Sequence, residues 1–370
     1  MIAHNLKEAY NAFDPSPLEE AIEPFYIQRG DSLAKLFSTF DQSPLRVLFS
    51  GHRGSGKTTE LNYTEKTLAA KYTVLNLKIG KYLDFKEFDS SDILKAILAA
   101  AGGFSSLEKA METITGGAFL VLGSPLFIPK FKKRIDISEN IMDRDYLSAL
   151  NKVVKTLQKR TGKNVLLLID DLDKPVSRIE KVLSEESQAF SEIECSLVLT
   201  VPITLFYSEK INRITEWFPH TEILPNIHAF DKEGNIYQPG TAVLKELVLR
   251  RMDPALITGE ALEKAVVYSG GVFRYLVKLI QDSAFSALMA GQNKIDIEHI
   301  NGSIAKMRSE FGRIIGLDDY DTLKKIHKQK NLTNIRQDVR FIANDIVLEY
   351  QNKTRWVDLH PIVIDLLPTD

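Results

Sequence analysis

Short apolar runs alternate with amphipathic segments over the first 235 residues of the chain. Five runs have the length and composition of strands, at residues 45–49, 72–78, 165–169, 194–201 and 221–224. Helical spacing of apolar residues lies between them, at 59–71, 92–101 and 143–160, with Ser90 and Ser91 as the expected caps of the second helix. The run 165–169 is apolar throughout, as in a strand buried on both faces of a parallel sheet. This alternation predicts an α/β sandwich with a mainly parallel sheet.

The pattern changes after residue 239, where the strand signals stop. Helices are expected at 241–252, at 259–268 and from the glycine pair 270–271 to about Ala290, closed by Gly291. Two short helices, 320–328 and 334–344, then precede strands 346–350 and 355–359, which flank a turn at 351–354. This order predicts a helical segment, and the helix–helix–hairpin order of the tail is that of a winged helix.

The most informative motif follows the first strand. Residues 51–58 read GHRGSGKT and match G-x-x-x-x-G-K-[ST] at every fixed position. The glycines let backbone N–H groups face a phosphate, and the following helix start adds positive partial charge. Lys57 is expected to reach the β- and γ-phosphates, and the Thr58 hydroxyl to ligate Mg²⁺. A chance glycine-rich turn is the alternative, against which the flanking strand and helix argue. The residues predicted to hold the nucleotide here are Gly51, His52, Arg53, Gly54, Ser55, Gly56, Lys57, Thr58 and Thr59.

A second polar group follows the run 165–169, about 110 residues after the glycine-rich loop. Asp170 and Asp171 stand at its carboxyl end, where an open α/β sheet keeps its ligand site. Asp170 is predicted to bind Mg²⁺, directly or through water, and Asp171 to orient or deprotonate the attacking water. An acidic N-cap of the next helix is the other interpretation. Thr200, near the end of the next strand, can meet the same water.

Two further segments are candidates for nucleotide contact. Tyr26, Ile27 and Arg29 precede the first strand, where many P-loop ATPases place part of the adenine pocket; an N-terminal helix packed on the core is the alternative. Arg274 lies in the first turn of a helix, an unfavourable place for a cation beside the positive end of the helix dipole. A phosphate ligand accounts for this arginine, and an exposed arginine without a function is the alternative.

Composition limits the classes of function. The 370 residues are 44% hydrophobic and 26% charged, enough for two or three domains and a sizeable core. The net charge of −2 gives no global attraction to nucleic acid or membrane. The single Cys195 excludes an intrachain disulfide and argues against a cysteine metal site. Without an apolar leader or a run of about 18 apolar residues, we expect a cytoplasmic protein with no stable membrane insertion.

Two basic segments stay open to several interpretations. The apolar stretch 118–128 is followed by basic residues up to 134; we favour a core hairpin with a solvated basic flank over a loop that contacts DNA, membrane or a neighbouring subunit. Residues 321–355 contain eight Lys or Arg and four Asp or Glu, a local charge of 8 − 4 = +4. Contacts with DNA phosphates, a solvated surface and a protein-docking wing all fit this charge.

Together these motifs resemble the AAA+/STAND P-loop ATPases, and most of all the initiator-type (origin-recognition-like) ATPases and related bacterial ATPases of mobile-element and defence systems. The resemblance covers about residues 25–360 and rests on GHRGSGKT, LLLIDDLDK, the polar strand end at Thr200, the lid sequence GGVFR and the tail. It implies a three-layer P-loop NTPase sandwich with a lid and a winged helix. The implied segments are a lead-in at 1–30, an ATPase core at 31–238, a helical lid at 239–300 and a winged-helix-like domain at 301–370.

The resemblance also implies residue roles. Thr200 would be sensor 1, and Arg274 would be sensor 2, which reads the γ-phosphate from the lid. Arg213 stands where the family often carries an arginine finger that enters a neighbour's site, and Arg250 or Arg251 could serve instead.

One departure from the family concerns the acidic pair. Many AAA+ members have Asp-Glu where this chain has Asp170-Asp171. The shorter Asp171 reaches less far toward a water, so slow hydrolysis is implied. The expected protein is an ATPase switch that uses ATP and Mg²⁺, and whose nucleotide state controls self-association and recruitment of double-stranded DNA or a protein effector. The alternative is a nucleotide-dependent sensor or adaptor in a bacterial defence or regulatory complex, with little hydrolysis.

Overall fold

The computed structural model describes residues 2–15, 25–29, 33–40, 44–105, 108–109, 118–121, 124–127, 140–351 and 354–368. The chain forms two compact units. The first, here called the helical unit, comprises Met1–Gly30, Gly51–Thr59 and Leu224–Asp370. The second, called the sheet unit, comprises Asp31–Ser50 and Glu60–Ile223. These two units are distinguished by compactness and do not test the four segments expected from the sequence. The division into lead-in, core, lid and winged-helix-like domain therefore stays a prediction.

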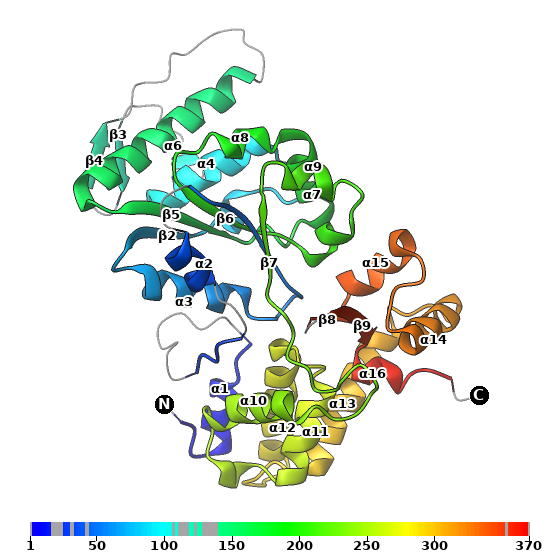
Figure 1. The fold of residues 1–370 in the computed structure, drawn as a ribbon. Helices are drawn as coiled ribbons and strands as arrows, with labels where there is room; N and C mark the ends of the chain where they lie inside the picture. The colour runs from blue at the N-terminus through cyan, green and yellow to red at the C-terminus, as the bar shows by residue number, and fades with distance from the viewer. Residues whose placement is uncertain are drawn as a thin grey trace. The chain divides into compact units, whose positions relative to one another are not determined.

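The sheet unit is built on five parallel strands in the order β2-β5-β6-β1-β7 (Figure 1). These strands are β1 (Arg46–Ser50), β2 (Tyr72–Lys78), β5 (Asn164–Asp170), β6 (Ser196–Thr200) and β7 (His220–Ile223). Each coincides with one of the five apolar runs to within two residues at either end. The register pairs Phe49 with Thr200 and Lys78 with Asp170, so the carboxyl ends of neighbouring strands are aligned. The predicted parallel α/β sheet is confirmed.

Helices cover both faces of this sheet, with α4 and α6 on one side and α2 and α3 on the other (Figure 1). The longer helices of this unit are α2 (Leu33–Thr39), α3 (Lys57–Leu68, whose first residues belong to the helical unit), α4 (Ser90–Ala101), α6 (Asn140–Thr161) and α7 (Val176–Glu186). Shorter ones are α8 (Gln188–Ser191), α9 (Ile211–Thr215) and the 3-10 turns η1 (Gly80–Tyr82) and η2 (Ile203–Tyr207). The three layers of the predicted sandwich are therefore present.

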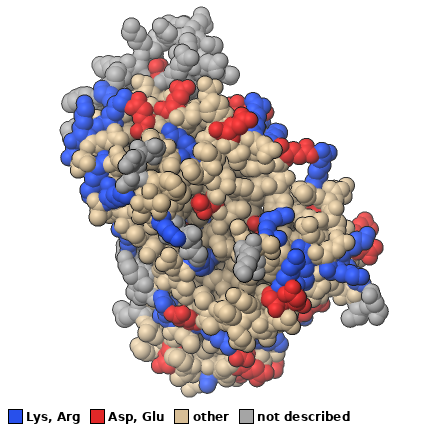
Figure 2. Space-filling model, viewed as in Figure 1, with Lys and Arg blue, Asp and Glu red and all other residues tan. Residues whose placement is uncertain are grey.

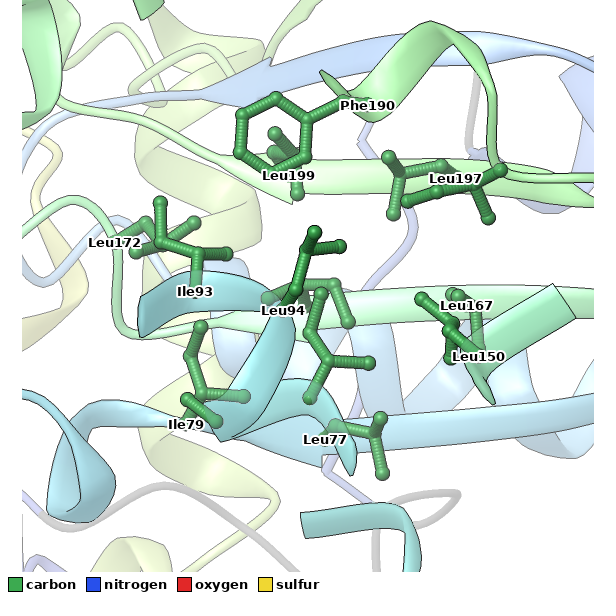
Figure 3. Packing of buried hydrophobic residues seen from close by; sticks show 14 of the residues in the cluster. Leu77, Ile79, Ile93, Leu94, Leu150, Leu167, Leu172, Phe190, Leu197 and Leu199 are labelled. Atoms are coloured by element: carbon green, nitrogen blue, oxygen red, sulfur yellow. The ribbon is translucent and has the colours of Figure 1, made fainter. Parts of the chain in front are cut away.

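The main core of the sheet unit lies between the sheet and α4, α6 and α7. Figure 3 shows leucines from β2, β5 and β6 pointing toward Ile93 and Leu94 of α4 and Leu150 of α6. These side chains are fully or almost fully buried, and each buried leucine or isoleucine stabilises the fold by about 1.5–3 kcal/mol. The core fixes the strands whose carboxyl ends carry the predicted acidic residues.

The N-terminus of α4 corrects one expectation. Its cap is Asp89, not Ser90 or Ser91. The Asp89 carboxylate accepts from the backbone N–H of Asp92 at 2.8 Å, and the Asp92 carboxylate accepts from the backbone N–H of Asp89 at 3.3 Å. This reciprocal pair satisfies two backbone donors, which a serine one residue later cannot do.

The hairpin within residues 118–128 is present as β3 (Ala118–Val121) and β4 (Ser124–Phe127), which pair antiparallel. The side chains of this hairpin and the basic residues after it lie outside the described part of the chain. Whether the segment belongs to the core or to a contact surface therefore stays a prediction.

The helical unit contains α1 (Leu6–Ala12), α10 (Gln238–Leu249), η3 (Pro254–Leu256), α11 (Gly259–Tyr268), α12 (Phe273–Met289) and α13 (Ile297–Gly312). Helix α12 contacts α1, α11 and α13. The three helices expected from the sequence are present as α10, α11 and α12, and their role as a lid stays a prediction. The sequence interpretation missed α13, although Asp296 caps it and buried apolar residues recur along it at Ile300, Ile304, Met307 and Phe311.

The end of the chain, also in the helical unit, has the expected order of two short helices and a hairpin. It consists of η4 (Leu317–Asp319), α14 (Tyr320–Gln329), α15 (Ile335–Ala343), β8 (Val347–Gln351), β9 (Arg355–Leu359) and α16 (Pro361–Ile364). Strands β8 and β9 pair antiparallel. The assignment of this segment to the winged-helix class stays a prediction. None of the helices in the described ranges has both the length and the apolar character needed to cross a membrane.

Candidate functional site

The glycine-rich loop follows β1 directly and belongs to the helical unit. Gly54 and Gly56 have φ values of +84° and +100°, a region that side chains rarely adopt, so two of the motif's glycines are needed for the backbone path. Lys57 is buried, and its Nζ donates to the carbonyl oxygens of Gly51 at 2.9 Å and His52 at 3.1 Å. The Ser55 hydroxyl is buried and has no hydrogen-bond partner among the described residues. A buried hydroxyl in this state fits a loop that accommodates a polar ligand.

Arg53 within the motif and the two threonines at its carboxyl end differ in exposure. Arg53 is exposed, whereas Thr58 and Thr59 are half-buried in the first turn of α3. The predicted contacts of these three residues with nucleotide or Mg²⁺ stay predictions.

Arg274 lies against this loop. Its backbone N–H donates to the carbonyl oxygen of Gly54 at 3.2 Å. A Cβ added to Gly54 would overlap the Cβ of Arg274 and would lie 2.9 Å from its Nε. Arg274 is half-buried in the first turn of α12, not exposed. Whether this arginine has a function is a question that stays open. Its proposed contact with a γ-phosphate stays a prediction.

The lead-in segment reaches the loop through Arg29. Its Nη2 donates to the carbonyl oxygen of Ser55 at 2.5 Å and its Nη1 to that of Pro225 at 3.0 Å. The guanidinium carbon also lies 4.3 Å from the ring centroid of Phe273, within the range of cation–π attraction. Residues 26–29 are irregular rather than helical, and Tyr26 and Ile27 are half-buried. The adenine-pocket role of Tyr26 and Ile27 stays a prediction.

His52, the second residue of the motif, is 1% exposed and bonded at both ring nitrogens. Its Nε2 accepts from the backbone N–H of Glu349 at 2.7 Å, and its Nδ1 lies 3.0 Å from Oδ1 of Asp345. Because Nε2 accepts, the ring proton is on Nδ1 and is donated to Asp345. The side chain therefore holds the loop to the C-terminal segment, and only the backbone of His52 is left for a nucleotide contact.

The carboxyl edge of the parallel sheet, within the sheet unit, carries the other predicted residues. Asp170 ends β5 and Thr200 ends β6, and both are buried. Ser50 ends β1, and its hydroxyl donates to the carbonyl oxygen of Val201 at 2.8 Å. The Thr200 hydroxyl has no hydrogen-bond partner among the described residues. The three ends lie on neighbouring strands in the order β5-β6-β1, so these polar residues share one edge of the sheet.

Asp171 has an unusual conformation for a residue that is not glycine. Its φ is +81°, a strain of a kind that clusters at functional sites. Its backbone N–H donates to Oδ1 of Asp170 at 2.9 Å, and its own carboxylate lies 2.5 Å from Nζ of Lys174. Helix α7 starts at Val176 with Pro175 at its cap position. The interpretation of the acidic pair as an N-cap is therefore wrong.

The three arginines considered for a finger differ in accessibility. Arg213 is exposed on α9. Arg250 pairs with Glu246 at 2.5 Å and donates to the carbonyl oxygen of Tyr26 at 2.9 Å. Arg251 is 9% exposed, and its burial lowers its pKa to about 10. A buried guanidinium cannot enter a neighbour's site, so the structure removes Arg251 from the alternatives, and the role of Arg213 stays a prediction.

The sequence predicts Thr58 and Asp170 as the protein ligands of Mg²⁺. In the part of the chain that the structure describes, no three His, Cys, Asp or Glu residues converge as metal ligands. Mg²⁺ is commonly bound through one or two protein oxygens plus substrate phosphates. Thr58 belongs to the helical unit and Asp170 to the sheet unit, so their joint role at one Mg²⁺ ion stays a prediction.

The basic character of the C-terminal segment is partly neutralised. Lys330 lies 2.5 Å from Asp358, Arg355 lies 3.2 Å from Glu349, and Arg340 is paired with Asp319. On the right of Figure 2, where Figure 1 places α14 and α15, Lys and Arg lie beside Asp and Glu. Asp358 and Asp319 lie outside the counted residues 321–355, so the local charge of +4 overstates the positive field that this segment presents.

No protein-family model and no curated protein sequence matches the chain. Similarity is found at the level of structure. The Aeropyrum pernix ORC2 protein in its ADPNP–ADP complexes matches with a TM-score of 0.52 and 14% identity, covering 96% of this chain and 95% of that one. Its ADP form matches with a TM-score of 0.51 at the same identity and coverage. The Aeropyrum pernix ORC1 protein in complex with DNA matches less well, with a TM-score of 0.46 and 15% identity over 90% of each chain. The chain therefore has the fold of the Aeropyrum pernix ORC2 protein. Its parallel sheet agrees with the P-loop NTPase fold that the motifs led us to expect.

Proposed function

We propose that the protein is an ATP-binding and ATP-hydrolysing switch. The observation that carries the proposal is the position of Arg274 against Gly54 of the phosphate-binding loop. A cation at the start of a lid helix and beside this loop can bind a terminal phosphate, and loss of that phosphate removes the contact. In other nucleotide switches, the γ-phosphate likewise controls the order and position of a segment of the protein.

The proposed roles follow the motif positions. Lys57 binds the β- and γ-phosphates, and the unpartnered Ser55 hydroxyl and loop N–H groups line the same loop. Thr58 and Asp170 are proposed as oxygen ligands or water-mediated partners of Mg²⁺, which neutralises phosphate charge when bound. Asp171 orients the water. The ADPNP and ADP held by the Aeropyrum pernix ORC2 protein support the choice of an adenine nucleotide.

Two substitutions test this function. Lys57→Ala should abolish ATP binding, because it removes the phosphate-binding cation, whereas Asp171→Ala should retain binding and lose turnover. Binding is measured by calorimetry and turnover by phosphate release, with Lys66→Ala on the same helix and Asp173→Ala in the same loop as matched controls. Retained ATP affinity in a folded Lys57→Ala protein would refute the proposal.

A second candidate function is a nucleotide-dependent sensor or adaptor with little hydrolysis. The ion pair between Asp171 and Lys174 favours it, because the carboxylate that would orient the water is engaged with an ammonium at 2.5 Å. Single-turnover hydrolysis, measured with and without double-stranded DNA, separates the two functions. A rate no faster than that of Asp171→Ala under both conditions would select the sensor.

The output is proposed to be self-association in the ATP state and recruitment of DNA or a protein through the C-terminal segment. The helix–helix–hairpin order at residues 320–359 supports a recruiting role. The ion pairs within that segment leave less positive charge for DNA phosphates than its sequence suggests.

A further inference from the structure

The phosphate-binding loop is attached to the C-terminal hairpin through one side chain. His52 gives both ring nitrogens to this segment, one to the Asp345 carboxylate and one to the backbone N–H of Glu349. The bonded residues are separated by 293 and 297 positions in sequence and belong to the same compact unit. Since His52 is 1% exposed, water cannot replace either bond without movement of the loop or the hairpin.

Asp345 is itself held in place. It lies between α15 and β8 with φ of +55°, and its backbone N–H donates to the carbonyl oxygen of Ile342 at 3.3 Å. Its second carboxylate oxygen accepts from the Tyr275 hydroxyl at 3.2 Å. Tyr275 is in α12, one residue after Arg274. The carboxylate therefore joins the loop, the start of the lid helix and the hairpin.

The link continues from His52 to the phosphate-binding lysine. The His52 carbonyl oxygen accepts from Nζ of Lys57 at 3.1 Å and from the backbone N–H of Ser55 at 3.1 Å. A shift of His52 would thus move the acceptors that orient Lys57 and the loop. Preorganised loop geometry is what gives such a site its affinity for phosphate.

We propose that Asp345 is a positioning residue of the nucleotide site. Together with the Glu349 N–H it forms a latch on His52, and the docked β8–β9 hairpin thereby sets the ATP affinity of the loop. By thermodynamic reciprocity, ATP stabilises the docked hairpin, so a partner that displaces the hairpin weakens ATP binding. The inference rests on the proposed function, because it concerns the regulation of that site.

The test compares glycine substitutions at two left-handed positions of the C-terminal segment. Asp345→Gly removes the carboxylate, and glycine tolerates the φ of +55°. Lys330→Gly is the matched control: its φ is +54°, and the side chain pairs with Asp358 instead of His52. Asp345→Asn retains an acceptor for His52 and should rescue binding.

The dissociation constant for Mg²⁺–ATP is measured by calorimetry on the full chain. We expect Asp345→Gly to raise the dissociation constant at least about tenfold, an effect within the usual range of coupling between two sites. The dissociation constants of Asp345→Asn and Lys330→Gly should stay within about threefold of the wild-type value. If Asp345→Gly does not fold, the ATP affinity of Tyr275→Phe tests the latch instead. This substitution removes one hydroxyl from the latch and should raise the dissociation constant about threefold to fivefold.

Hydrogen exchange distinguishes the latch from a purely structural role of Asp345, because a structural role would not make exchange in the hairpin depend on ATP. Saturating Mg²⁺–ATP should slow exchange in peptides covering residues 346–351 of the wild type, because the Glu349 amide is part of the latch. In Asp345→Gly the same peptides should not respond to ATP.

The outcomes separate the two proposals. A folded wild-type protein that does not bind Mg²⁺–ATP would overturn the proposed function and this inference with it. The latch alone would be overturned if the wild type binds Mg²⁺–ATP and folded Asp345→Gly binds it equally well. Where Asp345→Gly is unfolded, equal affinity in Tyr275→Phe would have the same consequence. So would an equal loss of affinity in Lys330→Gly, which would indicate general destabilisation.

Discussion

At the scale of single residues, two constraints require glycine at position 54. The φ of +84° disfavours any side chain, and a Cβ there would overlap the Cβ of Arg274. Gly291 shares only the first constraint, since its φ is +70° and nothing lies within 4 Å of an added Cβ. The comparison separates backbone strain from contact between the loop and the lid helix.

We therefore expect Gly291→Ala to lower the free energy of unfolding by about 1–2 kcal/mol, the ordinary cost of a left-handed alanine. Gly54→Ala should cost more than this and should also weaken ATP binding, because α12 must move away from the loop. Urea denaturation and calorimetry measure the two effects. Equal costs and unchanged ATP affinity in both variants would contradict the close contact with Arg274.

Asp171 shows at the same scale how conformation modifies a motif. The sequence indicates an acidic residue after a buried strand, and the structure places it at φ +81° with its carboxylate on Lys174. The carboxylate proposed to orient the attacking water is thus engaged by a neighbouring ammonium, a contact that the motif alone does not show.

At the scale of elements, the start of α4 depends on a capping box rather than on the serines beside it. The Asp89 carboxylate accepts from the backbone N–H of Asp92, whereas the Ser91 hydroxyl has no hydrogen-bond partner among the described residues. The difference gives a matched pair of substitutions at neighbouring positions.

Asp89→Ala should lower the free energy of unfolding by about 1 kcal/mol, because it leaves the backbone N–H of Asp92 without its acceptor. Ser91→Ala should change it by less than about 0.5 kcal/mol, since no hydrogen bond is lost. Chemical denaturation of the two variants measures the difference. A larger loss for Ser91→Ala would support the serine cap that the sequence suggested.

At the scale of the whole molecule, the exposed Arg213 leads to a prediction about assembly. An arginine finger acts in a neighbouring copy, so its removal should affect turnover without affecting binding to one chain. The exposed Arg313, in the helical unit, provides a matched control.

Arg213→Ala should bind Mg²⁺–ATP like the wild type and lose turnover, by at least about tenfold if the residue stabilises the transition state. Light scattering should show a larger mass for the wild type with ATP than without it. Arg313→Ala should keep both properties. Wild-type turnover in Arg213→Ala would remove Arg213 from the role, and a constant mass with ATP would refute nucleotide-dependent assembly.

The sequence by itself determined the features that depend on local chain properties. The apolar runs predicted all five strands of the parallel sheet, because a buried strand needs a continuous apolar stretch. The motif at residues 51–58 marked the loop, because its glycines and Lys57 stand at fixed spacing. Local patterns also predicted the hairpin of the C-terminal segment. Helix α13 was not predicted, although its cap residue and its apolar periodicity are present in the sequence.

Only the tertiary structure decided which distant residues meet. No local pattern indicates that His52 bonds to Asp345, 293 positions away, or that Arg29 donates to Ser55. The burial of Arg251 and the ion pairs that neutralise part of the tail are likewise decided by packing. Such contacts depend on how elements far apart in sequence come together, which one-dimensional spacing does not contain.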